Sequence, residues 1–239
     1  MFTLPLLELE DYLDPNFAEY DQEALPLIQH QLEPYRGSLI LSGPYIDLNP
    51  GSPERLIIEA TRQRLSQAHQ FARTLGAVEI VVLSSFLPIV SLSFYEEGWV
   101  KRSITFWRSY LESINAAITI SQGNTFEFRP DFLVRVVEAV NRPNFRLAFD
   151  LGHFLVYSQV DVETWLRQIA PHCYTVYVHS NDGSRDTHDE PFIGVLRSEQ
   201  LAQVAAALPA TTRFLAKMNN KATFAESMKW IEDSIGQKN

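Results

Sequence analysis

The chain has 239 residues, of which 46% are hydrophobic and 21% are charged, so it contains enough apolar material for a sizeable core. Its formal net charge of −9 disfavours binding to duplex nucleic acid or to an anionic membrane. The single cysteine, Cys173, excludes an intramolecular disulfide, and the apolar runs are far shorter than a membrane span, so we expect a cytoplasmic protein.

Seven short apolar runs along the chain have the composition of buried β-strands. They span residues 4–10, 38–42, 78–84, 117–122, 146–150, 174–179 and 213–217. Segments in which apolar residues recur every three or four positions predict helices at about 17–34, 53–75, 98–115, 130–141, 161–170, 197–207 and 221–236. Gly76 is expected to close the second helix in the left-handed conformation. This alternation predicts an α/β fold with a parallel sheet.

The alternation runs through the whole chain without a Gly/Ser-rich linker or a charge block, so we expect one domain over residues 1–239. Because no glycine-rich dinucleotide-binding turn follows a predicted strand, the pattern favours a TIM-type (β/α) barrel over a doubly wound sheet and predicts no nucleotide cofactor. Seven strands are one fewer than the usual eight. Either the barrel is incomplete, or another strand lies within the first 35 residues.

Titratable side chains follow two neighbouring predicted strands, at the ends where the active sites of parallel barrels lie. Asp150 ends the fifth run and His153 follows it, while the sixth run ends at His179 and leads into a loop that contains Asp186 and His188. Carboxylate and imidazole are ligands that zinc, manganese and iron prefer, and three protein ligands leave a position open for water or substrate. The pattern therefore predicts a metal site at these strand ends.

Three stretches of the chain resemble the xylose isomerase-like barrels, a superfamily that includes sugar-phosphate isomerases and epimerases and the apurinic endonucleases. They are residues 124–127 (NTFE), 149–153 (FDLGH) and 178–188 (VHSNDGSRDTH). The loop at residues 43–53 (GPYIDLNPGSP) is similar to the loop after an early strand of these barrels. The resemblance covers about residues 38–232 and implies a barrel that binds one to three divalent metals.

Four expected metal ligands of that family are replaced in this chain. Ser42 and Ser84 stand where the family usually has histidines, and Gly123 and Ala216 stand where it usually has glutamates. In the isomerases and epimerases the two glutamates ligate the metal and move the proton next to the carbonyl, so the resemblance implies that this reaction is impaired or lost. Glu127 is not a simple replacement, because it lies four residues beyond the expected position.

The ligands that remain form one complete set in the resemblance. In three-metal members, groups matching His153, Asp186 and His188 hold one metal, while those matching Asp150 and His179 contribute to a second. The resemblance therefore implies one divalent metal, zinc or manganese, at the first three residues, with Asp150 or His179 as general base. In the other interpretation, the five residues form a polar hydrogen-bond network without metal.

Further polar residues are candidates for contact with a substrate. Tyr45, Asn124, Asn181 and Arg185 are expected to contact sugar hydroxyls or a phosphate. The resulting hypothesis is a sugar-phosphate isomerase/epimerase-like barrel with a degenerate metal site, acting as a single-metal enzyme on a small sugar or a phosphorylated substrate. The alternative is a catalytically inactive barrel that binds a small molecule or a protein partner.

Overall fold

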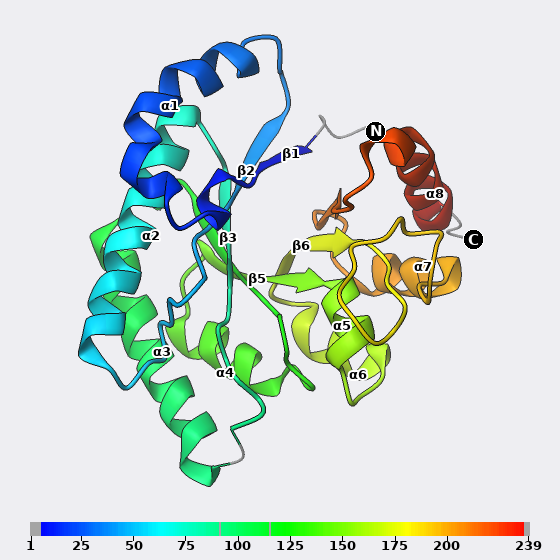
Figure 1. Cartoon of the computed structure of the whole chain (residues 1–239). Coiled ribbons are helices and arrows are strands. Elements are labelled where there is room, and N and C mark those ends of the chain that lie inside the picture. The colour runs from blue at the N-terminus through cyan, green and yellow to red at the C-terminus, as the bar shows by residue number, and fades with distance from the viewer. Residues whose placement is uncertain (1–5, 91, 115, 237–239) are drawn as a thin grey trace. The chain divides into compact units, whose positions relative to one another are not determined.

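The computed structural model describes residues 6–90, 92–114 and 116–236, and strands and helices alternate along them (Figure 1). The strands are β1 (Leu6–Leu9), β2 (Ser38–Ser42), β3 (Glu79–Leu83), β4 (Thr119–Gly123), β5 (Phe145–Asp150), β6 (Cys173–Val178) and β7 (Arg213–Ala216). The helices are α1 (Phe17–Leu32), α2 (Arg55–Leu75), α3 (Ser93–Ser113), α4 (Asp131–Val140), α5 (Leu151–Tyr157), α6 (Val162–Ile169), α7 (Ser198–Ala207) and α8 (Phe224–Gly236). Two short 3-10 helices, η1 (Asp11–Leu13) and η2 (Lys221–Thr223), precede α1 and α8.

The chain divides into two compact units, which we describe separately. Unit 1 comprises Met1–Ser85, Leu92–Gln122 and Glu138–Phe145. Unit 2 comprises Phe86–Ser91, Gly123–Val137 and Arg146–Asn239. The single domain expected from the sequence stays a prediction.

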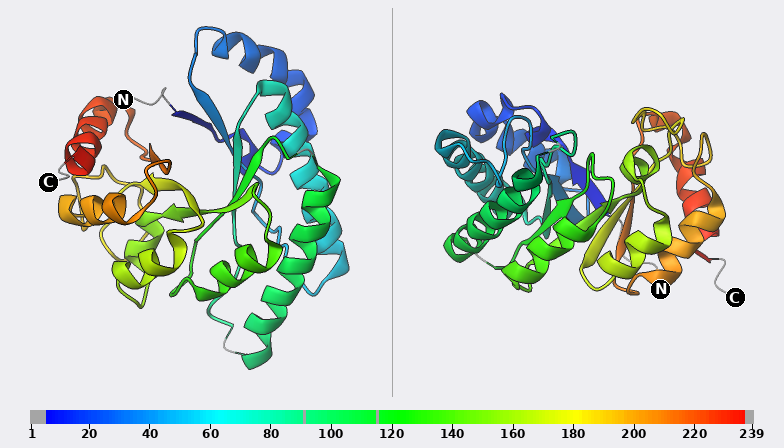
Figure 2. Two further views of the ribbon diagram at one scale, coloured as in Figure 1. Left: turned by 180° about the vertical axis from the view of Figure 1, so that it is seen from behind. Right: turned by 90° about the horizontal axis from the view of Figure 1, so that it is seen from below.

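Unit 1 is built from parallel strands covered by long amphipathic helices. β2 pairs in parallel with β1 and with β3, and its apolar residues Leu39, Ile40 and Leu41 are buried. Helices α1 and α2 pack against each other beside these strands (Figure 2). α2 ends at Gly76 with a φ of 73°, and the Gly76 N–H bonds to the last carbonyls of the helix, which confirms the expected left-handed cap.

Unit 2 places the titratable residues at the ends of its strands. β6 pairs in parallel with β5 and with β7, and Phe149 of β5 stacks on Trp165 of α6 with 5.4 Å between ring centroids. Asp161 caps α6 by accepting the N–H of Thr164 at 2.7 Å, and α7 packs against α8. This packing fixes the carboxyl ends of β5 and β6, from which the candidate site is built.

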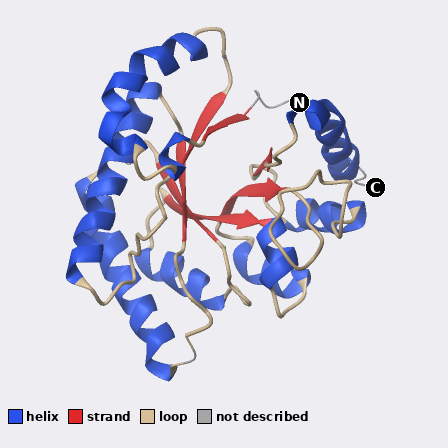
Figure 3. Cartoon of the chain, viewed as in Figure 1, coloured by secondary structure: helices blue, strands red, loops and turns tan. Residues whose placement is uncertain are grey.

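The predicted fold class is confirmed. Seven strands follow one another in the order β1 to β7, with helices between them (Figure 3), as expected for an α/β fold of the TIM-barrel type. Before β2, the described residues contain β1 as their one strand. Two helices differ from the prediction: α3 begins at Ser93 and not near residue 98, and the short helix α5 is absent from the predicted set.

Candidate metal centre

The junction of β5 and α5 fixes the first pair of titratable side chains. Asp150 ends β5 and caps α5, because its Oδ1 atom accepts the backbone N–H of His153 at 2.9 Å. Asn124 holds Asp150 from the other side: its amide donates to the Asp150 carbonyl at 2.9 Å and accepts the Asp150 N–H at 2.8 Å. These three residues are buried, so the position of the His153 ring follows from the local backbone.

The loop after β6 carries the remaining ligand candidates. His179 follows the last residue of β6 and is completely buried. Beyond it, Ser180 and Asp189 exchange backbone hydrogen bonds at 3.0 and 2.9 Å, which closes the loop between them. Asp186 and His188 lie within this closed segment. The loop therefore returns both side chains to the strand end from which it began.

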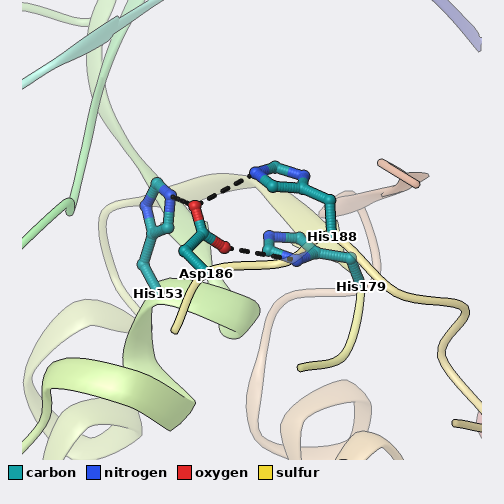
Figure 4. Close-up of side chains that lie close together, drawn as sticks. All are labelled: His153, His179, Asp186 and His188. Atoms are coloured by element: carbon teal, nitrogen blue, oxygen red, sulfur yellow. Dashed lines mark hydrogen bonds and ion pairs between the residues drawn. The ribbon is translucent and has the colours of Figure 1, made fainter. Parts of the chain in front are cut away.

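Four ligand atoms converge on one point (Figure 4). One nitrogen each of His153, His179 and His188 and one oxygen of Asp186 all lie within 4.8 Å of one another. The Oδ2 atom of Asp186 lies 3.1 Å from Nε2 of His153 and 3.1 Å from Nε2 of His188. The Oδ1 atom of Asp186 lies 3.8 Å from Nδ1 of His179.

In each of the three histidines, the ring nitrogen that does not face Asp186 lies close to an oxygen that accepts hydrogen bonds. His153 Nδ1 lies 2.8 Å from the carbonyl of Asn124, and His188 Nδ1 lies 3.0 Å from the carbonyl of Lys217. His179 Nε2 lies 2.9 Å from Oδ1 of Asp150. Because carbonyl and carboxylate oxygens accept, each of these ring nitrogens must carry a proton. In neutral imidazoles the three converging nitrogens are therefore unprotonated, which is the state that binds metal.

The donor atoms fit a divalent cation. Nδ1 of His179 and Oδ1 of Asp186 are buried and have no hydrogen-bond partner. Buried polar atoms without a partner are rare in folded proteins and call for an explanation such as an ion. Imidazole nitrogens and a carboxylate oxygen are donors that suit zinc, manganese or iron, and His153, Asp186 and His188 offer one each around a shared oxygen. The cluster could therefore hold a divalent cation, and the assignment of His153, Asp186 and His188 as its ligands stays a prediction.

Charges within the cluster shift the titration of its members. Burial acts to lower the pKa of His153, but the Asp150 charge and the hydrogen bond with Asp186 outweigh it and raise that pKa to about 9. The pKa of His188 is also raised, because Asp186 outweighs burial. Burial opposes ionisation of Asp150 and Asp186, yet the neighbouring imidazoles lower both pKa values well below the usual range.

Gly152 makes room for the His179 ring. A Cβ atom at Gly152 would lie 2.0 Å from Cε1 and 2.3 Å from Nδ1 of His179, so no other residue fits without displacing the ring. His179 in turn stacks on His188, with 3.9 Å between ring centroids and 4° between the ring planes. The two rings are thus held parallel and in contact.

The four residues expected to contact substrate have different surroundings. Both side-chain groups of Asn124 bond to the backbone of Asp150, and those of Asn181 bond to Gly152 O and Gly183 N at 2.8 and 3.0 Å. Arg185 is exposed and pairs with Asp182 at 3.4 Å. Tyr45 belongs to unit 1, where it lines a cavity of about 160 Å³. Their substrate-binding role stays a prediction.

The residues at the altered family positions carry no carboxylate. Gly123 ends β4 and Ala216 ends β7. The one glutamate near Gly123, Glu127, is almost fully buried, and its Oε2 atom accepts the backbone N–H of Thr125. This carboxylate therefore holds the loop after β4.

Sequence reasoning misses three contributors to the site. It does not single out Gly152, although a glycine between Leu151 and His153 is a signal for close approach of another group. The Lys217 carbonyl that orients His188 belongs to the backbone and leaves no signal in the side-chain pattern. Tyr157, at the end of α5, contacts the His153 ring with 6.4 Å between centroids.

Comparisons with known proteins place these observations in a family. Over residues 6–234 the sequence matches the family described as xylose isomerase-like TIM barrel. A curated relative, an uncharacterised protein of Methanocaldococcus jannaschii, is 23% identical over an aligned length of 184 positions, and the alignment covers 74% of this chain. The matched part is 60% of that relative, so the chain spans about 60% of its length.

Solved structures have the same fold at low sequence identity. A D-tagatose 3-epimerase-like protein has a TM-score of 0.78 and 17% identity, with 97% of this chain and 88% of that chain covered. A protein from Thermus thermophilus, soaked with ZnCl2, has a TM-score of 0.71 and 22% identity, with 98% and 89% covered. No helix in the described part of the chain is long and apolar enough to cross a membrane. The fold and the match over residues 6–234 show that this chain belongs to the xylose isomerase-like TIM barrel family.

Proposed function

We propose that the chain is a single-metal enzyme that acts on a small sugar or a sugar phosphate. In this proposal His153, Asp186 and His188 hold one zinc or manganese ion, and His179 is the general base. The observation that carries the proposal is the set of outer hydrogen bonds, which orients an unprotonated nitrogen of each neutral histidine toward Asp186. Such outer partners are typical of metal-ligating histidines.

The parallel stacking of two histidines separates the metal ligands from the base. The lone pair of an imidazole nitrogen lies in the plane of its ring, and the His179 and His188 planes are 4° apart with 3.9 Å between centroids. One ion therefore cannot lie in both planes. Because His188 and His153 share the same Asp186 oxygen at 3.1 Å, these three form the ligand set, and His179 remains beside it.

The bound ion would supply polarisation of a carbonyl or of a water molecule. His179 Nδ1 is the atom that accepts a proton from the polarised group. The other ring nitrogen, Nε2, already carries a proton, which it donates to Asp150. The carboxylate of Asp150, which lies 2.9 Å from Nε2 of His179, stabilises the imidazolium that forms. Asp150 is thus a positioning residue in this proposal. Of the two general bases that the sequence suggests, Asp150 and His179, we propose His179.

A sugar substrate is supported by the family and by its relatives. The similar solved structures include a D-tagatose 3-epimerase-like protein. Epimerisation needs a proton acceptor and a proton donor on opposite faces of the carbon, and Gly123 and Ala216 cannot provide them. We therefore propose a reaction with one base in which no hydrogen leaves carbon, namely hydrolysis by an activated water.

Zinc affinity of two histidine variants tests this assignment. We expect His188→Ala to lower zinc affinity by more than about 100-fold, because a direct ligand is lost, whereas removal of an outer partner costs about 10- to 100-fold. His179→Ala is expected to bind zinc within a few-fold of wild type. The matched control is His30→Ala, which removes an exposed histidine of unit 1. Affinity is measured by competition with a chelator, on protein purified without a histidine tag.

Two results would contradict the proposal. Equal losses in His179→Ala and His188→Ala would make His179 a fourth ligand and the site a closed, structural one. Absence of zinc and manganese binding in wild type would favour the alternative, a catalytically inactive barrel in which the cluster is a hydrogen-bond network.

A further inference from the structure

An apolar pocket opens beside the metal centre, within unit 2. It has a volume of about 620 Å³ and is lined by Leu87, Pro88, Ile89, Phe126, Phe128, Tyr157 and Gln159. Its volume lies within the range of small-molecule sites, which is roughly 300–1,000 Å³. We call this feature the apolar pocket.

Three segments far apart in sequence are held together to form the pocket. Phe86 packs on Phe132 with 4.4 Å between ring centroids, which anchors the segment with Leu87 and Ile89. The Gln159 N–H bonds to the Phe128 carbonyl at 3.0 Å, which joins the end of α5 to the loop after β4. The pocket is therefore a built feature of unit 2.

Tyr157 connects the pocket to the cluster. It lines the pocket and packs edge to face on Phe126 with 5.1 Å between centroids. Its ring also contacts His153, with 6.4 Å between centroids. A molecule in the pocket would thus lie next to the candidate metal ligands.

The lining is unsuited to the hydroxyls of a free sugar. Among the lining side chains, the polar groups are the Gln159 amide and the Tyr157 hydroxyl, and the other five are apolar. Sugar hydroxyls buried against such a surface lose hydrogen bonds to water without replacement. Aromatic side chains instead favour contact with flat apolar rings.

We propose that the apolar pocket binds an aryl substituent of a sugar derivative whose polar end lies at the metal centre. This rests on the proposed function and specifies its substrate class as aryl-substituted sugars. The exposed side chains of Leu87, Ile89 and Phe126 then become covered when the ligand binds. Coverage of this face by a second copy of the chain is an outcome that the test distinguishes.

The test compares two ligands that differ in their apolar end. Zinc-loaded protein is titrated calorimetrically with phenyl β-D-glucopyranoside and with methyl β-D-glucopyranoside. We expect the phenyl glycoside to bind about tenfold more tightly, as burial of a phenyl ring implies. Phe126→Ala and Ile89→Asp are expected to bring the ratio of the two affinities close to one. The matched control, Phe224→Ala, removes an exposed phenylalanine of unit 2 outside the pocket and is expected to keep the ratio.

Three results would overturn the pocket assignment. The first is equal affinity for the two glycosides, and the second is a phenyl preference that persists in Phe126→Ala and Ile89→Asp. The third is a dimer in sedimentation analysis that Ile89→Asp dissociates, because the face would then contact a second copy. Both variants change exposed side chains, so we expect them to fold.

The same titration in EDTA separates this proposal from the proposed function. If zinc fails to bind, the single-metal function fails, and the phenyl preference measured without metal decides the pocket by itself. If zinc binds but the phenyl preference is absent, the pocket assignment fails and the metal centre remains.

Discussion

Gly152 and His179 fit together so closely that a Cβ atom on Gly152 would lie 2.0 Å from Cε1 of His179. Gly152→Ala must therefore displace the buried His179 ring and break its 2.9 Å bond to Asp150. We expect a loss of about 1–3 kcal/mol in the free energy of unfolding, as for other overpacked cores. Urea denaturation measures it.

The control for this variant is Gly236→Ala. Gly236 ends α8, and among the described residues no heavy atom would lie within 4 Å of a Cβ atom there. Its unfolding free energy is expected to be unchanged or slightly higher, because alanine is the better helix former. Equal stability of Gly152→Ala and wild type would show that the His179 ring is free to move.

The left-handed backbone of His188 predicts a difference between two variants that remove the same ligand. His188 has a φ of 52°, which glycine adopts without strain and alanine does not. We expect His188→Gly to be more stable than His188→Ala by about 1 kcal/mol, although both lose zinc binding. Urea denaturation of the two variants in EDTA compares them without a metal contribution. If His188→Ala is the more stable one, the loop does not hold this conformation.

The cluster predicts a stability change with pH in metal-free protein. The pKa of His153 is raised to about 9, above its unfolded value near 6.5, so its contribution is full below about pH 6.5 and is lost as pH rises toward 9. The pKa values of Asp150 and Asp186 are lowered, so their contributions are present above about pH 4 and are lost in acid.

The melting temperature in EDTA should therefore fall between pH 6.5 and 9. Saturating zinc should remove that fall, because the ion replaces the protons on the converging nitrogens. The measurement is a series of thermal melts at constant ionic strength. Identical pH profiles with and without zinc would contradict this prediction.

The altered family positions predict that exchange of substrate hydrogen with solvent is absent. With Gly123 and Ala216 in place of two glutamates, we expect no solvent deuterium to enter D-fructose or D-tagatose at the carbon next to the carbonyl. Proton NMR in D₂O detects this exchange. If exchange occurs at enzymatic rates and Asp150→Asn abolishes it, a base removes hydrogen from carbon and the hydrolytic proposal is wrong.

Local signals in the sequence are sufficient to predict the strands, and to predict that the titratable side chains of the cluster lie close together. The apolar runs correspond to β1 to β7, and the positions of Asp150 and His179 relative to their strands bring both to one site. The sequence does not reveal α5, because this helix has seven residues, includes Gly152 and is too short for a helical period.

The roles within the cluster depend on contacts that spacing does not encode. The ring plane of His179 is set by Gly152, Asp150 and His188, and the last of these lies in a loop. The apolar pocket is lined by three segments that are far apart in the sequence. The apolar residues of each segment by themselves give no signal of a common pocket. Only the folded chain brings them together.

Calorimetric titration of the wild type with zinc decides whether the cluster is a metal centre. The titration is carried out at pH 7.5 and at pH 5.5, in two buffers of different ionisation enthalpy, with His188→Ala beside it. We expect one zinc per chain, weaker binding at the lower pH, release of protons at pH 7.5, and no such binding in His188→Ala. Absent heats in wild type, or equal heats in wild type and His188→Ala, would show that the cluster is not a metal centre.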